Sequence, residues 1–247
     1  MQVQNSVALV TGANRGIGKA FVEALVQAGA TRIYATARNL EALRDIVAIA
    51  PDHVIPIALD ITQPDQIATV VRQAQDVNLL INNAGVAGTG GLFTSDSLGT
   101  AEWEMQTNYF GTLRMMQAFA PILKQNQGGA IINVLSIVSV VNVPVFASYS
   151  ASKAALNSIT QAARAELSAQ NTQVIGVFPG PVDTAMSTGV PLDKVAPIRV
   201  AQLALQAVEN TIEDVYPDPI AEQVFSELQK PLKTVEKQFA TMLPQAA

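Results

Sequence analysis

A tyrosine and a lysine stand four residues apart in the segment Tyr149-Ser150-Ala151-Ser152-Lys153. On a helix, residues at this spacing lie on one face, so the two side chains would meet. A tyrosine hydroxyl has an ordinary pKa near about 10, and a neighbouring ammonium lowers that pKa because it favours the phenolate. A drop of about three units, worth about 4 kcal/mol, would let Tyr149 give a proton to a carbonyl oxygen while hydride arrives at the carbon. By itself the spacing also fits an ordinary half-exposed pair, so the interpretation needs support from the rest of the chain.

The second segment that could do chemistry is a glycine-rich turn, Thr11-Gly12-Ala13-Asn14-Arg15-Gly16-Ile17-Gly18. Glycines let a backbone turn tightly and let a pyrophosphate approach the amides at a helix N-terminus. The spacing G-x-x-x-G-x-G differs from the commonest dinucleotide fingerprint, and alone it could be only a tight turn. It follows a β-branched run and opens an amphipathic segment, which is where a βαβ unit places its phosphate loop. The turn therefore predicts dinucleotide binding.

The end of the next β-branched run indicates which dinucleotide is bound. Enzymes that use NAD usually place an acidic residue there, whereas this chain has Ala37 and Arg38, with Arg15 in the glycine turn. A guanidinium group offers a planar fork of donors to a 2′-phosphate. Two solvated surface arginines are the alternative, but both lie where the adenosine ribose is expected. The sequence thus favours NADPH/NADP+ as the cofactor.

Short β-branched runs alternate with amphipathic segments as far as Pro181. The predicted strands are Val7–Val10, Arg32–Ala37, Val54–Asp60, Leu79–Asn82, Ile131–Leu135 and Gln173–Phe178. The predicted helices are Ile17–Ala28, Leu40–Ala50, Pro64–Gln75, Gly99–Gln125 and Tyr149–Ala169. This pattern predicts an α/β fold, a single-domain Rossmann-type doubly wound parallel sheet with helices on both faces. Ligands bind beyond the carboxyl ends of such strands, and each predicted strand ends in unusual residues: Thr11-Gly12, Arg38, Asp60, Asn82–Gly85, Ser136 and Pro179-Gly180.

The alternation stops after Pro181, but no repeat or low-complexity linker divides the chain. Residues 1–247 are therefore predicted to form one dinucleotide-binding catalytic domain. Residues 184–197 are predicted to be a substrate loop. Helices are expected at about 199–211 and 221–242, so that residues 219–247 would make a helical tail.

Composition excludes several classes of function. The chain has no cysteine and one histidine, His53, so we expect no disulfide, iron–sulfur cluster or other metal site. A net charge of −5 offers no basic field to nucleic acid or anionic lipid. The N-terminal residues lack the features of a signal peptide, and the uncharged stretch between Lys124 and Lys153 is broken by amides, serines and a proline. We expect a cytoplasmic protein with no membrane segment.

Several motifs occur together and in a fixed order: Thr11–Gly18, Asn82–Gly85, Asn108, Ser136, Tyr149, Lys153 and Pro179-Gly180. A chain with this set resembles the short-chain dehydrogenase/reductase superfamily, here from about Val7 to Thr184. The resemblance implies that Tyr149 is the acid/base and that Lys153 lowers its pKa and binds the cofactor ribose. It also implies that Ser136 hydrogen-bonds the substrate carbonyl and that Asn108 holds a water in a proton relay to Lys153. Cofactor contacts are expected at Gly12, Asn14, Arg15, Gly16, Ile17, Gly18, Arg38, Asp60, Ile61, Asn83, Ala84, Gly85, Tyr149, Lys153, Pro179, Gly180, Val182 and Thr184.

Two of these assignments have alternatives. Ser136 and Ser139 both follow the fifth predicted strand, but Ser136 stands at the family's usual distance before Tyr149, so Ser139 is interpreted as a loop residue. Asn108 could instead be a structural residue that kinks its helix, since asparagine is a poor helix former.

The substrate pocket is predicted from two segments that carry apolar side chains. Val143 and Phe146 precede the tyrosine, and Met186 and Val190 lie in the later loop. Apolar walls suit hydrophobic carbonyl compounds, although the same side chains could simply pack the loops. We predict an NADPH-dependent oxidoreductase that reduces small hydrophobic ketones or aldehydes to alcohols, with Tyr149 as the proton donor.

Two departures from the family's fatty-acid members bear on the alternatives. Those members reduce 3-oxoacyl groups on acyl carrier protein and tend to have several basic residues before the fifth strand, whereas residues 124–130 contain one lysine, Lys124. They also end in a V-x-G-G strand that packs in the interface of a tetramer. This chain has Val215-Tyr216-Pro217-Asp218-Pro219 at that place, which makes a tetramer doubtful. A homodimer that packs through the central helix stays possible. A 3-oxoacyl-[acyl-carrier-protein] reductase is the alternative enzyme. A non-catalytic NADP(H)-binding regulator is the alternative from another class.

Overall fold

A seven-stranded parallel sheet runs through the centre of the molecule, in the order β3-β2-β1-β4-β5-β6-β7. The computed structural model describes residues 1–228. The strands are β1 Val7–Val10, β2 Arg32–Ala37, β3 Val54–Ala58, β4 Leu79–Asn82, β5 Gly129–Val134, β6 Thr172–Val177 and β7 Asp214–Val215. The strand order reverses direction between β1 and β4, so the predicted doubly wound α/β sheet is confirmed.

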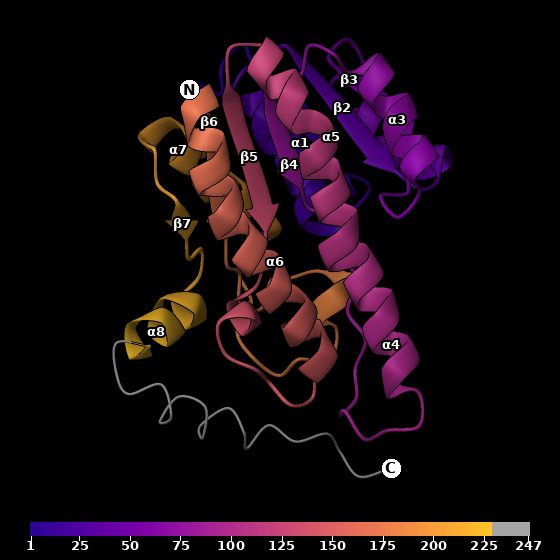
Figure 1. Ribbon diagram of the computed structural model, residues 1–247, viewed down its shortest axis with the longest axis vertical. Helices are drawn as coiled ribbons and strands as arrows, with labels where there is room; N and C mark the ends of the chain where they lie inside the picture. Colours follow the sequence, from indigo (N-terminus) through magenta and orange to yellow (C-terminus); the bar gives the residue numbers. More distant parts are fainter. Residues whose placement is uncertain (229–247) are drawn as a thin grey trace.

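Helices cover both faces of this sheet (Figure 1). One face carries α1 (Gly16–Gln27), α2 (Arg44–Val47) and α7 (Pro197–Asn210), and the other carries α3 (Pro64–Gln73), α5 (Thr112–Gln125) and α6 (Ala147–Leu167). The remaining α-helices are α4 (Ser97–Glu104) and α8 (Pro219–Glu227). Shorter helical turns are η1 Leu40–Leu43, η2 Met105–Gly111, η3 Ile137–Ser139, η4 Ser168–Gln170 and η5 Ala185–Ser187.

The alternation of side chains along β1 divides the core into two layers. Ala8 and Val10 pack in the cluster under α1 and α7, whereas Leu9 points into the cluster under α3 and α5. Because both faces are covered, β1 is apolar along its whole length, as expected for a parallel strand. None of the helices within residues 1–228 combines the length and the apolarity needed to cross a bilayer.

Several predicted elements differ from the structure. The helix predicted over Leu40–Ala50 is a 3₁₀ turn, η1, followed by the single turn of α2, and Leu43 and Ile46 are its fully buried side chains. The predicted helix Gly99–Gln125 is continuous from Ser97, but its centre, η2, is wound as a π-helix. The short strand β7 was missed, since two residues carry no detectable periodicity. Of the helix predicted at about 221–242, α8 accounts for the first part, and residues 229–247 of the predicted tail lie outside the described residues.

The carboxyl ends of the strands face the end of the molecule where α4, α8 and the first turns of α6 lie (Figure 1). A buried network stiffens this edge: Asn82 Nδ2 on β4 donates to Asn133 Oδ1 on β5 at 2.9 Å. Asn133 Nδ2 in turn donates to Thr160 Oγ1 of α6 at 2.9 Å. The residues that follow β4 and β5 therefore start from a rigid base.

Candidate active site

The glycine turn after β1 has a backbone that only glycine can follow closely. Gly12 and Gly16 have φ of +65° and +54°, in the left-handed region. A Cβ on Gly18 would lie 2.1 Å from the carbonyl oxygen of Gly12 and 2.5 Å from Asn83 Nδ2. The turn and the start of α1 thus pack backbone against backbone.

The N-terminus of α1 has the features of an anion site. Arg15 is its N-cap residue in an extended conformation, and none of the side chains in residues 1–228 caps the helix there. Its first turn also contains no acidic residue. Free backbone donors at the positive end of a helix, behind a glycine turn, fit the pyrophosphate of a dinucleotide.

Hydrogen bonds join this turn to the segment after β4. Thr11 Oγ1 accepts from the backbone N–H groups of Asn83 (2.9 Å) and Ala84 (3.0 Å). Asn83 Nδ2 donates to the carbonyl oxygens of Thr11 (2.9 Å) and Gly12 (3.1 Å). The amide of Asn83, which the sequence predicted to contact the cofactor, is therefore used to hold the glycine turn in place.

The adenosine side of the expected cleft lies between the ends of β1 and β2. Ala13 N–H donates to the carbonyl oxygen of Thr36 at 2.8 Å, which brings the glycine turn beside the end of β2. Arg15 and Arg38 are both exposed at this junction. Their guanidinium groups are therefore accessible to an anion at the place where the sequence expects the ribose.

Two further predicted contact residues follow β3. Asp60 Oδ1 accepts from the backbone N–H (2.9 Å) and the hydroxyl (2.7 Å) of Thr62, which forms a tight Asx turn. The Ile61 side chain is buried in the core, and a Cβ on Gly111 would lie 2.8 Å from it. Only the backbone of Ile61 is therefore available for the predicted cofactor contact.

Tyr149 and Lys153 lie in the first turns of α6, on one face as their spacing predicts. Lys153 Nζ is 5.8 Å from the centroid of the Tyr149 ring. It donates to the carbonyl oxygen of Val134, the last residue of β5, at 2.8 Å. The Lys153 side chain is 4% exposed, and this burial lowers its pKa to about 8.

The pKa of Tyr149 moves in the direction opposite to the expected one. The pKa of Tyr149 is raised to about 12, and burial is the largest cause. The hydroxyl of Ser136 lowers this pKa, and the charge of Glu104 raises it. The expectation that Lys153 lowers the pKa of Tyr149 is not met in this structure. The physical reason is that the ammonium is directed to the Val134 carbonyl, while partial burial of the half-buried phenol disfavours its charged form.

Asn108 is fully buried inside the π-helical segment η2. Its Oδ1 accepts from Val86 N–H, and its Nδ2 donates to the Val86 carbonyl oxygen, both at 2.8 Å. Nδ2 also donates to Ser152 Oγ of α6 at 2.9 Å. A Cβ on Gly85 would lie 3.2 Å from Asn108 Oδ1 and 3.4 Å from Lys153 Nζ, so Gly85 brings the two side chains together. The side chain of Asn108 is thus a structural link, and a π-helical turn of this kind is common beside functional sites.

Ser136 follows β5 and is 8% exposed, and its Oγ lies 3.3 Å from the Pro179 carbonyl oxygen. Ser139 is equally buried but lies in η3, not in a loop as expected from the sequence.

Gly180 N–H donates to the buried Asp218 at 2.7 Å, and the same carboxylate caps α8. Sequence analysis missed this role of Asp218, although the pattern Asp218-Pro219 at a helix start is a recognisable cap signal.

The later loop lies over the glycine turn. Thr184 is close to Gly16, since a Cβ on Gly16 would lie 3.2 Å from Thr184 Cγ2. Val182 is buried and pairs with Val195 through an isolated bridge. Both residues therefore belong to the loop that meets the glycine turn, and their contact with the nicotinamide stays a prediction.

The predicted substrate residues differ in their surroundings. Phe146 meets the Tyr149 ring edge-on, with centroids 6.4 Å apart, and Met186 is 53% exposed in η5. Val190 is half-buried, whereas Val143 is buried in a cluster that includes Val224 of α8. Val143 therefore packs a loop, which was the alternative for each of these side chains.

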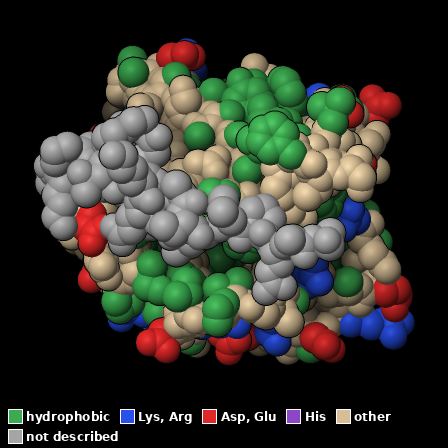
Figure 2. Space-filling view, turned by 90° about the horizontal axis from the view of Figure 1, so that it is seen from below, with side chains coloured by type: hydrophobic (Ala, Val, Ile, Leu, Met, Phe, Trp, Pro, Cys, Tyr) green, Lys and Arg blue, Asp and Glu red, His purple; other side chains and the backbone are tan. Residues whose placement is uncertain are grey.

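The sequence did not single out the segment between β4 and α4. Gly90 N–H donates to the Val145 carbonyl oxygen at 3.0 Å, which joins this segment to the residues before α6. Leu92 and Phe93 follow and are strongly exposed. Figure 2 views this end of the molecule and shows hydrophobic side chains gathered on it in several groups.

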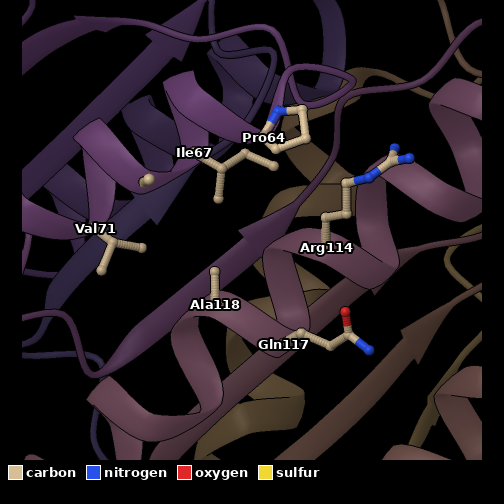
Figure 3. A pocket seen from close by; sticks show the side chains of 7 residues that line it. Pro64, Ile67, Val71, Arg114, Gln117 and Ala118 are labelled. Carbon is tan, nitrogen blue, oxygen red and sulfur yellow. The ribbon is translucent and has the colours of Figure 1, made fainter.

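A separate groove of about 430 Å³ lies between α3 and α5 (Figure 3). Ile67 and Val71 of α3 face Arg114 and Ala118 of α5 across it. None of the predicted site residues lines this groove. The candidate active site is therefore the cluster at the carboxyl ends of the strands.

Comparison with known proteins agrees with this arrangement. Residues 6–194 match the family described as short chain dehydrogenase. The 3-oxoacyl-[acyl-carrier-protein] reductase of Thermotoga maritima is 32% identical over 203 residues, which cover 77% of this chain and 80% of that protein. The chain belongs to the short-chain dehydrogenase/reductase family. Like other members of that family, it is an oxidoreductase with a nucleotide-binding Rossmann fold.

Solved structures of short-chain dehydrogenases also resemble the chain. One from Burkholderia cenocepacia, in complex with NADP, superimposes with a TM-score of 0.91 at 43% identity and covers 97% of this chain and 99% of that one. One from Burkholderia phymatum, in complex with NAD, has a TM-score of 0.82 at 24% identity and covers 93% and 96%. The dinucleotide class follows from the family, whereas these two similar structures hold different dinucleotides, NADP and NAD.

Proposed function

We propose that this protein reduces ketones or aldehydes to alcohols with NADPH, and that Tyr149 donates the proton to the carbonyl oxygen. The observation that carries this proposal is the convergence of side chains from two parts of the chain, Tyr149 and Lys153 of α6 and Ser136 after β5. The hydroxyl of Ser136 acts on Tyr149 and lowers its pKa, and Lys153 lies over the Tyr149 ring, beside Gly85 of the segment that holds the glycine turn. These groups form one site at the end of the sheet where the dinucleotide fits.

Each residue has a distinct role in this proposal. A bound nicotinamide supplies the hydride. Ser136 donates a hydrogen bond that positions the carbonyl oxygen of the substrate. Tyr149 has a pKa of about 12, so it is protonated at neutral pH and holds the proton that this oxygen takes. Lys153 is positioned by Val134 next to the tyrosine and binds the ribose. Asn108 fixes the neighbouring Val86 backbone with its side chain. A water held at this residue is proposed to carry the proton relay to Lys153.

NADPH is proposed as the reductant because of the charges at the adenosine end. Arg15 and Arg38 are exposed at the junction of the glycine turn and β2, and Ala37 stands where NAD enzymes usually have an acid. A 2′-phosphate suits two guanidinium groups, whereas a ribose hydroxyl needs an acceptor. The NADP complex of the 43% identical Burkholderia cenocepacia protein supports this choice.

The proposal is tested by following NADPH absorbance with a panel of hydrophobic ketones and aldehydes, using the wild type and Tyr149→Phe. We expect Tyr149→Phe to lose about 10²- to 10⁴-fold in turnover, the range of a general acid, while NADPH binding measured by fluorescence persists. Tyr34→Phe is the matched control, because Tyr34 lies on β2 and its hydroxyl bonds to Asp76. Full turnover in Tyr149→Phe would refute the assignment of the proton donor.

A 3-oxoacyl-[acyl-carrier-protein] reductase is the second candidate. It is favoured by relatives with that name, at 32% identity in Thermotoga maritima and 33% in Vibrio cholerae. Lys124 at the end of α5 is the one basic residue of the segment before β5, which disfavours an acidic carrier protein. Turnover confined to 3-oxoacyl thioesters would establish this candidate, and absence of turnover with every carbonyl compound would favour the non-catalytic regulator.

A further inference from the structure

Asp218 is a buried carboxylate outside the set of predicted site residues. It directly precedes α8, and both of its side-chain oxygens accept hydrogen bonds from backbone N–H groups. Oδ1 accepts from Ala221 at 2.9 Å and caps α8, whereas Oδ2 accepts from Gly180 at 2.7 Å. One carboxylate therefore joins the start of α8 to the turn that follows β6.

The contact between Asp218 and this turn is tight. A Cβ on Gly180 would lie 2.6 Å from Asp218 Oδ1 and 3.3 Å from its Cγ, so only glycine lets the carboxylate lie against the turn. An aromatic stack fixes α8 on the same end of the sheet. Tyr216 stacks on Phe225 of α8, with centroids 4.1 Å apart, and on Phe178 after β6, with centroids 5.2 Å apart. The place of Asp218 beside the turn is thus set by packing as well as by hydrogen bonds.

The bond from Gly180 fixes the orientation of a whole peptide group. The N–H of Gly180 and the carbonyl oxygen of Pro179 belong to one peptide bond, which is planar and trans, so the two groups point in opposite directions. The carbonyl oxygen accepts from Ile137 N–H at 3.0 Å and from Ser136 Oγ at 3.3 Å. Asp218 therefore holds one side of the peptide group, and the segment after β5 holds the other. Rotation of this peptide group would break all three bonds.

This arrangement connects Asp218 to the hydroxyl that positions the substrate in the proposed function. A carboxylate that accepts from a peptide N–H polarises the peptide group, which makes its carbonyl oxygen a stronger acceptor. That oxygen holds the Ser136 hydroxyl through a bond of 3.3 Å, which is long for two oxygens. A substrate carbonyl can replace so weak a bond, whereas the Ser136 side chain stays where the peptide has placed it.

We propose that Asp218 is a positioning residue of the reduction, which acts on Ser136 through the Pro179-Gly180 peptide group. The carboxylate fixes the peptide group, and the peptide group directs the Ser136 hydroxyl toward the carbonyl oxygen of the substrate. Asp218 itself contacts no reacting atom and transfers no proton. This inference rests on the proposed function and deepens it, because it makes α8 part of the support of the site.

The test is Asp218→Ser, which separates the two bonds of the carboxylate. A serine hydroxyl is a good N-cap for α8, but its single oxygen, on a shorter side chain, cannot also reach Gly180. Glu222→Gln is the matched control, because it removes an exposed carboxylate from the first turn of the same helix. With hydrophobic ketones we expect Asp218→Ser to lose about 10-fold in kcat/KM, while its Tm falls by no more than about 4 °C. Glu222→Gln should change neither quantity.

A double-mutant cycle with Ser136→Ala measures whether Asp218 acts through Ser136. Asp218→Ser should cost about 10-fold in kcat/KM in the wild type but less than about 2-fold in Ser136→Ala, because the side chain that it positions has been removed. A merely structural role would lower kcat/KM by the same factor in both proteins. Equal factors would therefore overturn the proposal.

Exchange of the Gly180 amide hydrogen with solvent, followed by NMR, tests the contact without any substrate. We expect this exchange to be at least about 10-fold faster in Asp218→Ser than in the wild type, and unchanged in Glu222→Gln. Unchanged exchange in Asp218→Ser would overturn the role of the carboxylate. If no ketone or aldehyde were reduced, the proposed function would fail, while the exchange rates would still decide whether Asp218 holds the peptide group.

Asp218→Asn serves if Asp218→Ser fails to fold. Its single amide oxygen can accept from Gly180 or from Ala221 but not from both, and the exchange rates of these two amides show which one is released. We expect kcat/KM to fall only if Gly180 is released. Full turnover in a variant with a released Gly180 amide would overturn the proposal.

Discussion

The buried ammonium of Lys153 should make the stability of this protein depend on pH in a defined window. Its pKa is lowered from 10.5 to about 8 by burial, so between these values the unfolded chain binds more protons than the folded one. The free energy of unfolding therefore rises with pH across this window, and below about pH 8 the full penalty of about 3 kcal/mol applies. Lys153→Met removes this contribution.

The magnitude follows from the two pKa values. Between about pH 7 and about pH 9.5, the Lys153 contribution should increase the wild-type free energy of unfolding by about 2 kcal/mol relative to Lys153→Met. The loss of the hydrogen bond to Val134 destabilises the variant by about 1–3 kcal/mol, but by the same amount at every pH. The difference between the two pH values thus isolates the titration from the packing.

Urea unfolding of both proteins at one protein concentration measures this difference. Lys124→Met is the control, because Lys124 is exposed at the end of α5 and should leave the pH dependence as in the wild type. The measurements stay below about pH 10, the ordinary pKa of tyrosine. Above this pH, the raised pKa of Tyr149 in the folded protein makes the free energy of unfolding fall as the pH rises. Parallel pH profiles for the wild type and Lys153→Met would refute the reasoning.

Two further predictions concern the cofactor. Arg38→Asp should weaken NADPH binding by about 10-fold or more and improve NADH binding, because a carboxylate repels a 2′-phosphate and accepts from a ribose hydroxyl. The dissociation constants of both dinucleotides measure this change. An unchanged preference for NADPH over NADH would contradict the prediction. Gly18→Ala should destabilise the fold by about 1–3 kcal/mol and abolish dinucleotide binding, because the added Cβ would lie 2.1 Å from the Gly12 carbonyl oxygen. Thermal unfolding and NADPH titration measure both effects, and wild-type binding in Gly18→Ala would show that the turn does not hold the cofactor.

Local patterns determined much of this protein from its sequence. The limits of β1, β2 and β4 and the start of the glycine turn agree with the predicted ones, because continuous apolar runs and glycines act on neighbouring residues. The four-residue spacing of Tyr149 and Lys153 placed them on one helix face for the same reason. The order of these motifs was enough to indicate the family and hence the fold.

The tertiary structure decided the partners, the burial and the ionisation of the site. The spacing of Tyr149 and Lys153 suggested a lowered tyrosine pKa, but the ammonium bonds to Val134 on β5 and the half-buried phenol has a raised pKa. Likewise the amide of Asn83 is used by the glycine turn, and the carboxylate of Glu104 is enclosed beside Gly88. Solvation and hydrogen-bond partners depend on residues that are far apart in the chain and meet only when the sheet and helices pack, so no local pattern carries this information.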